Sequence, residues 1–205
     1  RADEGMWIPM LLQNNEQDMQ EMGMNITAED IYSINHSSMK DAVVLFDGGC
    51  TGEIVSNQGL LLTNHHCGFD WIQYHSTVEH DYLTNGFWAM SQEEELPCPG
   101  ISAVMLKSME DVTDRVLEGV TKETSNDERA EIVTENIKKI KEDAEANSDY
   151  QVVIKSFYHG NKYYMIYNEV FKDVRMVGAP PSNIGKFGGD TDNWVWPRHT
   201  GDFSV

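Results

Sequence analysis

Residues 60–68 have the sequence LLLTNHHCG, and this stretch decides the fold that the sequence predicts. A short apolar strand delivers two adjacent histidines into a tight turn. Upstream, the apolar run 42–46 and the segment 50–56 predict two further strands, because β-branched side chains pack well on a pleated sheet. The turn at residues 57–59 joins the second of these strands to the strand that precedes the histidines, and it ends in a glycine suited to a positive φ angle. The three segments together predict an antiparallel meander.

Two of the three cysteines flank this meander. Cys50 begins the second strand and Cys67 follows the histidine pair, and this placement favours one disulfide and an oxidising compartment. Closing a loop of this length would stabilise the fold by about 3 kcal/mol in the chain-entropy account of disulfides. Cys98 lies in the rigid sequence LPCPG at residues 96–100 and is expected to stay a free thiol.

The adjacent histidines, His65 and His66, are candidates for a general base. Chymotrypsin-type barrels hold their general base in this way, on a strand that enters a tight turn locked by the disulfide of the next residue. A base must lie within hydrogen-bond reach of its nucleophile, so the value of the disulfide would be positional. Because His66 directly precedes Cys67, we favour it over His65 as the general base. The alternative is that both are turn histidines bonded to backbone groups.

A second candidate lies in the sequence HTGDFSV at residues 199–205. An aspartate at the mouth of an alternating strand can lie against an imidazole, where it fixes the tautomer and stabilises the imidazolium. Asp202 fits that role, although only the match to His66 favours it over an ordinary turn aspartate. Ser204 follows Asp202 too closely to meet His66 in triad geometry. With no Gly-x-Ser-x-Gly motif in the sequence, we expect the nucleophilic serine outside this chain.

A third candidate lies in DNWVWPR at residues 192–198. Asn193 could accept a hydrogen bond from an ammonium group, and Trp194 could offer its π face to the same cation. The alternative is core packing, which we favour for Trp196. The segment therefore indicates a site for a substrate amine.

The composition limits the classes of fold and of partner that this chain can have. The chain has 205 residues and 40% apolar side chains, enough for a packed core. Its formal charge is −19, from 15 basic and 34 acidic residues, and this argues against a nucleic-acid partner, which needs clustered Lys and Arg. No stretch approaches the roughly 20 continuous apolar residues of a membrane span.

The sequence divides into an N-terminal helical segment at 1–40 and a strand-rich part at 41–205. Within the second part, residues 109–147 are highly charged, with apolar residues near helical spacing, and predict two inserted helices broken near Gly119 and Ser125. Further strands are predicted at 101–107, 151–158 and 162–170. We expect a mainly β chain: a chymotrypsin-like (trypsin-like) antiparallel β-barrel with short N-terminal helices and an inserted helical segment.

Several motifs occur together in this chain: GCTG at 49–52, TNHHCG at 63–68 and the Gly-rich stretch 188–203. Through them the chain resembles the N-terminal portion of the bacterial dipeptidyl-peptidase 7 and dipeptidyl-peptidase 11 family of chymotrypsin-clan serine peptidases. The resemblance extends over residues 2–7, 41–56, 60–68, 171–181 and 184–204.

The resemblance implies a double β-barrel, of which residues 41–205 form the first barrel, and a reaction that releases dipeptides from the free N-termini of peptides. It makes His66 the general base and Asp202 its orienting carboxylate, and it places Asn193 and Trp194 at the substrate amine. The serine would lie in the absent remainder of the catalytic domain, so the chain alone is expected to be inactive. No cofactor and no metal are implied, and a homodimer of the full-length enzyme stays open.

The resemblance also implies a secreted protein, with a signal peptide removed, in the periplasm or at the cell surface of a Gram-negative bacterium. Within the family, residues 41–53 and 87–90 resemble the group that prefers an acidic penultimate residue. Residues 188–190 resemble the group that prefers a hydrophobic one. We favour the acidic preference, with the hydrophobic preference as the alternative.

Two other classes of function remain as alternatives. One is a metal module, since His75 and His80 have an H-x₄-H spacing and His66, Cys50 and Cys67 could supply further ligands. Stoichiometric zinc in the purified protein would support it. The other is a catalytically inactive barrel that binds peptides with the same aromatic wall, which a lack of reaction with a fluorophosphonate probe would support.

Overall fold

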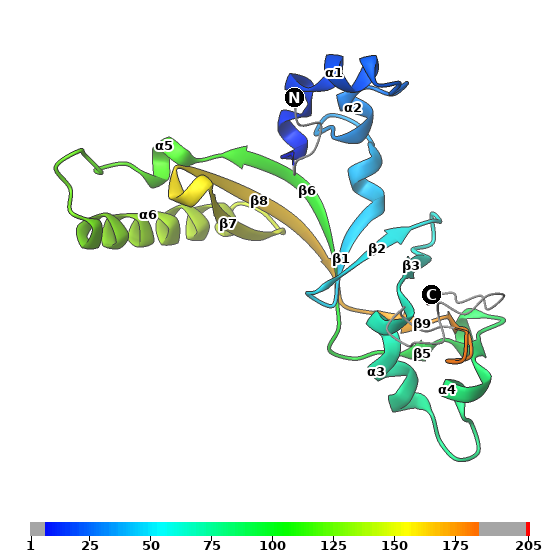
Figure 1. Ribbon diagram of the computed structural model, residues 1–205. Helices are drawn as coiled ribbons and strands as arrows, with labels where there is room; N and C mark the ends of the chain where they lie inside the picture. Colours follow the sequence, from blue (N-terminus) through cyan, green and yellow to red (C-terminus); the bar gives the residue numbers. More distant parts are fainter. Residues whose placement is uncertain (1–6, 185–203) are drawn as a thin grey trace. The chain divides into compact units, whose positions relative to one another are not determined.

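The computed structural model describes residues 7–184 and 204–205 (Figure 1). The chain divides into two compact units. Unit 1 comprises Arg1–Asp41 and Leu106–Glu169, and unit 2 comprises Ala42–Met105 and Val170–Val205. Each unit is described by itself. Unit 2 contains the predicted meander and the histidine pair, and unit 1 contains the charged helical segment.

Unit 2 begins with the predicted meander. The strands β1 (Val43–Phe46), β2 (Cys50–Ile54) and β3 (Leu61–Thr63) pair in antiparallel fashion. Gly59 in the turn before β3 has φ of +84°, as predicted. The rest of the unit consists of α3 (His65–His75), α4 (Tyr82–Asn85), β4 (Phe87–Trp88), η3 (Gln92–Glu94), β5 (Leu96–Pro97), β9 (Arg175–Met176) and β10 (Gly178–Ala179).

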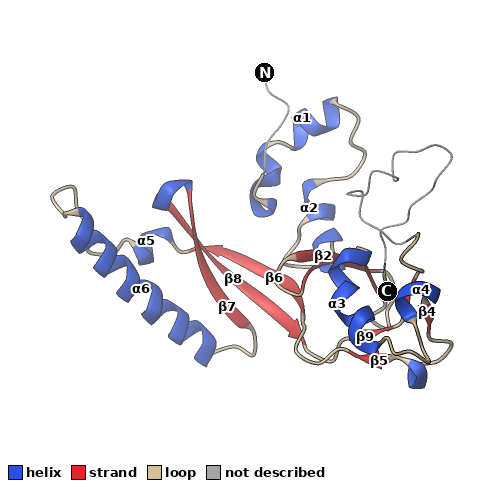
Figure 2. Ribbon diagram, turned by 60° about the horizontal axis from the view of Figure 1, so that its bottom comes forward, coloured by secondary structure: helices blue, strands red, loops and turns tan. Residues whose placement is uncertain are grey.

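Two strands pass from one unit to the other, β6 (Ala103–Asp111) and β8 (Lys162–Phe171). With β7 (Gln151–Phe157) they complete a six-stranded sheet of order β3-β2-β1-β6-β8-β7. Two further sheets of two strands each pair β10 with β4 and β5 with β9. Figure 2 shows the strands in red, with β6, β7 and β8 side by side.

The six-stranded sheet differs from the closed barrel expected from the sequence. Among the described residues the sheet is open, with β3 and β7 as its edges. The chain is also a mixture of helix and sheet rather than mainly β. One reason is that residues 65–75, expected to begin as a tight turn, form the helix α3. A chymotrypsin-like barrel is therefore not confirmed by these residues.

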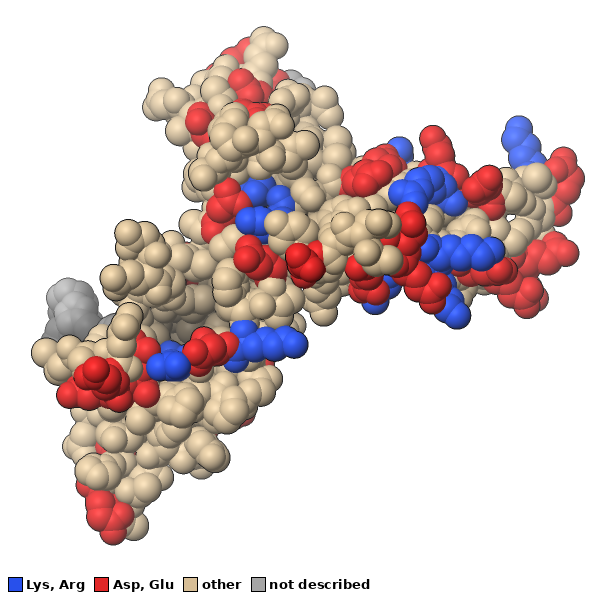
Figure 3. Space-filling model, turned by 180° about the vertical axis from the view of Figure 1, so that it is seen from behind, with Lys and Arg blue, Asp and Glu red and all other residues tan. Residues whose placement is uncertain are grey.

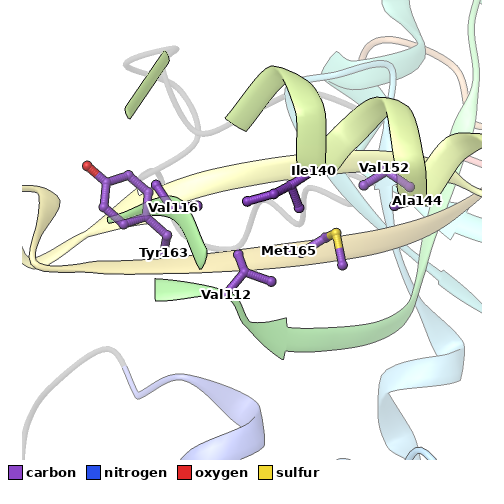
Figure 4. Packing of buried hydrophobic residues seen from close by; sticks show 7 residues of the cluster. All are labelled: Val112, Val116, Ile140, Ala144, Val152, Tyr163 and Met165. Atoms are coloured by element: carbon purple, nitrogen blue, oxygen red, sulfur yellow. The ribbon is translucent and has the colours of Figure 1, made fainter. Parts of the chain in front are cut away.

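The core of unit 1 lies between its helices and strands (Figure 4). α5 (Thr113–Val116) and α6 (Asn126–Ala146) occupy the segment predicted to be helical, and Gly119 between them has φ of +87°. A capping box of Ser125 and Glu128 begins α6, and α6 packs on β7. The buried cluster consists of Val112, Val116, Ile140, Ala144, Val152, Tyr163 and Met165.

The N-terminal part of unit 1 is a series of short helices. These are η1 (Pro9–Asn14), α1 (Glu16–Glu21), α2 (Ala28–Ile31) and η2 (Met39–Ala42). A capping box of Thr27 and Asp30 begins α2. The backbone N–H of Met109 on β6 donates to the hydroxyl of Tyr32 at 2.9 Å, which ties this segment to the sheet.

The exposed side of α6 carries acidic and basic side chains interspersed (Figure 3). Lys139 pairs with Glu135 at 2.8 Å and Lys141 with Glu145 at 3.5 Å, both one helical turn apart. Exposed pairs of this kind contribute little to stability because solvent screens them, so the charge run is a solvated helix face. No helix in the described part of the chain is both long enough and apolar enough to span a bilayer.

The carboxylate of Asp111 links β6, β8 and α5 and predicts how unit 1 responds to acid. It accepts hydrogen bonds from the Lys162 ammonium at 2.8 Å and from the Thr113 backbone N–H at 2.9 Å. Burial raises the pKa of Asp111, but these hydrogen bonds outweigh it and lower the pKa from 3.8 to about 2. Because the folded-state pKa is depressed, the carboxylate stabilises the fold above pH about 4, and the contribution is lost as the pH falls through about 2.

Asp111→Asn is therefore expected to weaken the pH dependence of the free energy of unfolding between pH about 4 and about 2. Urea titrations of the two proteins at several pH values measure the difference. The exposed Glu123→Gln, in the loop before α6, is the control and should keep the wild-type profile. An Asp111→Asn protein with an unchanged profile would contradict the assignment of the acid response to this carboxylate.

Candidate active site

The histidine pair lies in the first turn of a helix rather than in a tight turn. α3 begins at His65, directly after β3, and Asn64 between them is extended, with ψ of 146°. The backbone N–H of Cys67 donates to the carbonyl of Asn64 at 3.0 Å, which closes the first turn. The strand thus delivers the histidines as predicted, but the helix fixes their positions through successive backbone hydrogen bonds.

The predicted disulfide joins Cys50 at the start of β2 to Cys67 in α3, with 6.2 Å between their Cα atoms. It therefore fastens the first turn of the helix to the meander. Both cysteines pack against the core of unit 2. That core consists of Phe46, Ile72, Cys98, Ile101, Met176 and Ala179. Cys98 is a buried free thiol, and burial raises its pKa.

The two histidines differ sharply in exposure. The side chain of His66 is exposed, and its ring lies beside the disulfide: one imidazole nitrogen and the sulfurs of Cys50 and Cys67 all lie within 4.8 Å of one another. His65 is only 2% exposed and meets the ring of Phe69 edge-on, with 6.2 Å between ring centroids. Only His66 is therefore positioned to exchange a proton with a molecule that arrives from solvent.

His65 instead contacts the end of the described chain. Its Nδ1 atom lies 3.3 Å from the hydroxyl oxygen of Ser204, and both residues are buried. Ser204 exchanges two backbone hydrogen bonds with Thr63, of 2.8 and 3.0 Å, and Val205 exchanges two with Gly178, of 2.8 and 3.0 Å. The segment at 204–205 is thus fixed between the edge of β3 and β10.

The role of His65 and Ser204 was missed by the sequence reasoning, which treated one as a rejected base and the other as a rejected nucleophile. No local signal could have indicated it, because the two residues are 139 positions apart in the sequence.

The remaining predicted site residues are Asp202, Asn193 and Trp194, and all three lie outside the described residues. Of the predicted set, the structure brings together His66, Cys50 and Cys67. The alternative metal module would also need His75 and His80. Within residues 7–184 and 204–205, the only cluster of potential metal ligands is Cys50, His66 and Cys67, and it does not include those two histidines. His75 bonds instead to the carbonyl of Pro97 at 2.9 Å.

A groove of about 940 Å³ in unit 2 passes beside the histidine helix. Thr63, Gly68 and Ser204 line it next to His65, together with apolar side chains of Leu61 and Trp71. A concave, largely apolar surface with a few polar groups is the usual form of a ligand or substrate cleft. The groove therefore follows the part of α3 that contains Gly68, Trp71 and Ile72, and neither His65 nor His66 is among its lining residues.

Ser204→Ala is expected to lower the free energy of unfolding of unit 2 by about 1–3 kcal/mol, since it removes a hydrogen-bond partner from a buried imidazole. Native-state hydrogen exchange of the β3 and α3 amides in the intact protein measures this loss. Ser182→Ala is the matched control, because the buried Ser182 hydroxyl oxygen has no hydrogen-bond partner among the described residues. Equal losses in the two variants would argue against a specific tether at Ser204.

Comparison with known proteins identifies the family. The model of the family "Peptidase S46" matches residues 2–205. An Asp/Glu-specific dipeptidyl-peptidase of Flavobacterium psychrophilum is 57% identical over 202 residues, which are 98% of this chain and 28% of that protein. A dipeptidyl-peptidase 7 of Capnocytophaga gingivalis is 50% identical over 206 residues, which are 100% of this chain and 29% of that protein.

Solved structures of dipeptidyl-peptidases also match this chain. The crystal structure of Porphyromonas endodontalis DPP11 in complex with the dipeptide Arg-Glu matches with a TM-score of 0.81 and 50% identity, over 98% of this chain and 31% of that one. The chain therefore spans less than a third of the length of these relatives. The resemblance inferred from the GCTG and TNHHCG motifs is confirmed. The chain belongs to the peptidase S46 family.

Proposed function

We propose that the full-length protein is a serine-type dipeptidyl-peptidase, which releases dipeptides from the free N-termini of peptides. This chain supplies the general base and its orienting carboxylate. The observation that carries the proposal is the exposed His66, held beside a disulfide in the first turn of a helix. The family match over nearly the whole chain and the dipeptidyl-peptidases among its relatives support it.

In this proposal His66 accepts the proton of a serine hydroxyl as that oxygen attacks the peptide carbonyl, and later gives the proton to the leaving amine. Asp202 holds the imidazole in the tautomer that leaves one nitrogen free to accept. Asn193 and Trp194 bind the ammonium group of the substrate, so that the substrate peptide is cut after its second residue. All three roles follow the family motif that surrounds them.

The nucleophile is proposed to lie outside this chain, which alone should be inactive. Ser204 is the serine nearest to Asp202 in sequence, but it is 5% exposed and its hydroxyl contacts His65. That oxygen is engaged in a buried tether, a position that does not suit attack on a substrate. We further propose that the meander belongs to a chymotrypsin-like barrel completed by residues beyond the described part.

For specificity, we propose a preference for an acidic penultimate residue. Two relatives called Asp/Glu-specific are 57% and 52% identical to this chain, and one called dipeptidyl-peptidase 7 is 50% identical. We also propose export to the periplasm or cell surface, after removal of a signal peptide. The disulfide supports this, because disulfides persist in oxidising compartments.

The test is turnover of fluorogenic dipeptide substrates by the full-length protein. We expect hydrolysis when the N-terminus is free and the second residue is Asp or Glu, little hydrolysis of the N-acetylated counterparts, and labelling by a fluorophosphonate. Faster turnover of substrates with an apolar second residue would assign the protein to the hydrophobic-preferring group. Binding of these peptides without turnover or labelling would instead support an inactive peptide-binding protein.

A further inference from the structure

We propose that the groove in unit 2 is the slot for one strand of the full-length protein, and that the residues directly following Val205 form this strand. The groove lies along the edge of β3 that faces away from β2, and Ser204 and Val205 belong to its lining. The chain spans 28% of the Flavobacterium psychrophilum relative, so most of such a protein lies outside it. The inference rests on the proposed barrel and adds the position and register of one of its strands.

The register of this strand is fixed by the residues that precede it. Ser204 forms an antiparallel bridge with Thr63, in which each backbone N–H donates to the carbonyl of the other residue, at 2.8 and 3.0 Å. In an antiparallel pair one chain advances as the other recedes, so the first residue after Val205 falls opposite Leu61. The N–H and C=O of Leu61 point to the same edge as those of Thr63, because these groups alternate between the two edges of a strand. The first residue after Val205 can therefore exchange two backbone hydrogen bonds with Leu61.

The other wall of the groove continues along the same path. Val205 exchanges backbone hydrogen bonds with Gly178, at 2.8 and 3.0 Å, so the strand has a neighbour on each side. Antiparallel pairing leads its next residues past those that precede Gly178. Four of these line the groove, namely Val174, Arg175, Met176 and Val177. On the side of β3, the lining extends through Leu60 to the hairpin turn at 56–59. The groove thus runs in the direction that the chain takes from Val205.

The lining predicts which side chains the strand carries. Leu61 lines the groove and packs against the core of unit 2, to which Met176 also belongs. Directly opposed residues share a face and successive residues alternate between faces. The first and third residues after Val205 therefore point toward this core, and the second points away from it. We expect apolar side chains at the first and third positions.

An uncovered groove beside a free sheet edge would make the protein prone to aggregate. Unpaired N–H and C=O groups at an edge are a template for pairing with another chain, and here they lie beside an apolar groove of about 940 Å³. A strand of the same protein removes both exposed features. A second copy of the chain is the alternative occupant, but Ser204 and Val205 of the same chain already hold the entry to the slot.

The register is tested by cysteine cross-linking in the full-length protein with Cys98→Ala. Leu61→Cys is combined with a cysteine at the first residue after Val205 and, in a matched control, with a cysteine at the second. Directly opposed residues of this kind have Cα atoms about 5.5 Å apart, within reach of a disulfide, whereas the control cysteine lies on the opposite face. We expect a disulfide within one chain in most molecules of the first variant and in few of the control, as measured by peptide mass analysis.

A second measurement uses the full-length protein without cysteine substitutions. The Leu61 amide should exchange hydrogen as slowly as the Leu62 amide, within about tenfold, because Leu61 is bonded to the new strand and Leu62 is paired with β2. Aspartate at the first position after Val205 should speed exchange of the Leu61 amide by at least about tenfold, because a carboxylate is costly to bury without a partner. Aspartate at the second position should leave this rate unchanged.

A disulfide that forms equally well in the control variant would refute the register. A Leu61 amide that exchanges as fast as an unprotected amide would leave β3 with a free edge and overturn the strand together with the proposed barrel. Protection of Leu61 without a cross-link in the first variant would assign the slot to another segment, and a cross-link between two chains would assign it to a second copy. None of these outcomes involves peptide hydrolysis, so the proposed reaction can hold while the strand assignment fails.

Discussion

Replacement of His66 by alanine in the full-length protein is expected to lower kcat for dipeptide substrates by about a millionfold, with KM little changed. Alanine removes the imidazole that would accept the serine proton, and no water-borne base reproduces its position. Rates of hydrolysis at saturating and limiting substrate separate the two constants. A nearly unchanged KM is expected because the proposed amine contacts, Asn193 and Trp194, are retained.

His36→Ala is the matched control for this experiment. His36 is also exposed, with its side chain 61% accessible, and it belongs to unit 1, beside Glu29 rather than the disulfide. Its variant should retain wild-type kcat. Asp202→Asn should lose about 10⁴-fold in kcat, because an amide favours the wrong tautomer of the imidazole.

A His66→Ala protein that keeps a tenth or more of its activity would refute the assignment. A loss confined to His65 variants would move the base to the buried histidine. That outcome is disfavoured by the structure, in which the His65 imidazole is buried against Ser204 and Phe69. His65→Asn is expected to change stability more than it changes the chemical step.

The strands of unit 2 were predictable from local sequence because each carries a short-range signal. β1 is a β-branched run, Gly59 supplies a positive φ angle, and the residues on either side form β2 and β3. The same holds for α6, whose capping box and apolar spacing are visible in the sequence. The disulfide was also predictable, because the hairpin brings the start of β2 close to the end of β3.

What could not be predicted depends on contacts distant in sequence. α3 contains His, Gly, Phe, Trp and Tyr, residues of modest helix propensity, so the sequence did not indicate a helix there. Its stability comes from packing, with Ile72 fully buried in the core of unit 2. The two-residue strands β9 and β10 exist only because they pair with β5 and β4, more than 75 residues earlier.

The same reasoning explains why the contact of His65 with Ser204 was not predicted. Its place as a buried tether depends on Ser204, 139 residues away in sequence. The choice of His66 as the candidate base depended only on its sequence neighbour Cys67. The contact of His65 with Ser204 depends on how the whole chain folds. Local sequence therefore indicated the catalytic candidate but not the contact that fixes the strand near it.

Replacing both bridging cysteines, in Cys50→Ser/Cys67→Ser, is expected to lower the stability of unit 2 by about 3 kcal/mol. The bridge spans 17 positions of sequence, and the loop it closes restricts the unfolded chain. Native-state hydrogen exchange of the α3 and β2 amides, followed at increasing denaturant, gives the free energy of opening of this unit. The slope against denaturant should also rise, because the unfolded chain without the bridge is less compact.

Cys98→Ala is the control, since it removes a buried cysteine of the same core without opening a loop. It should cost about 1 kcal/mol, the typical effect of a point substitution, and leave the denaturant slope unchanged. In the full-length enzyme the double variant should also lose up to about 10²-fold in kcat, because an ångström of displacement at His66 suffices for that. If the double variant kept wild-type opening energies in α3, the helix would hold the histidines without the bridge, and the positional role given to the disulfide would be wrong.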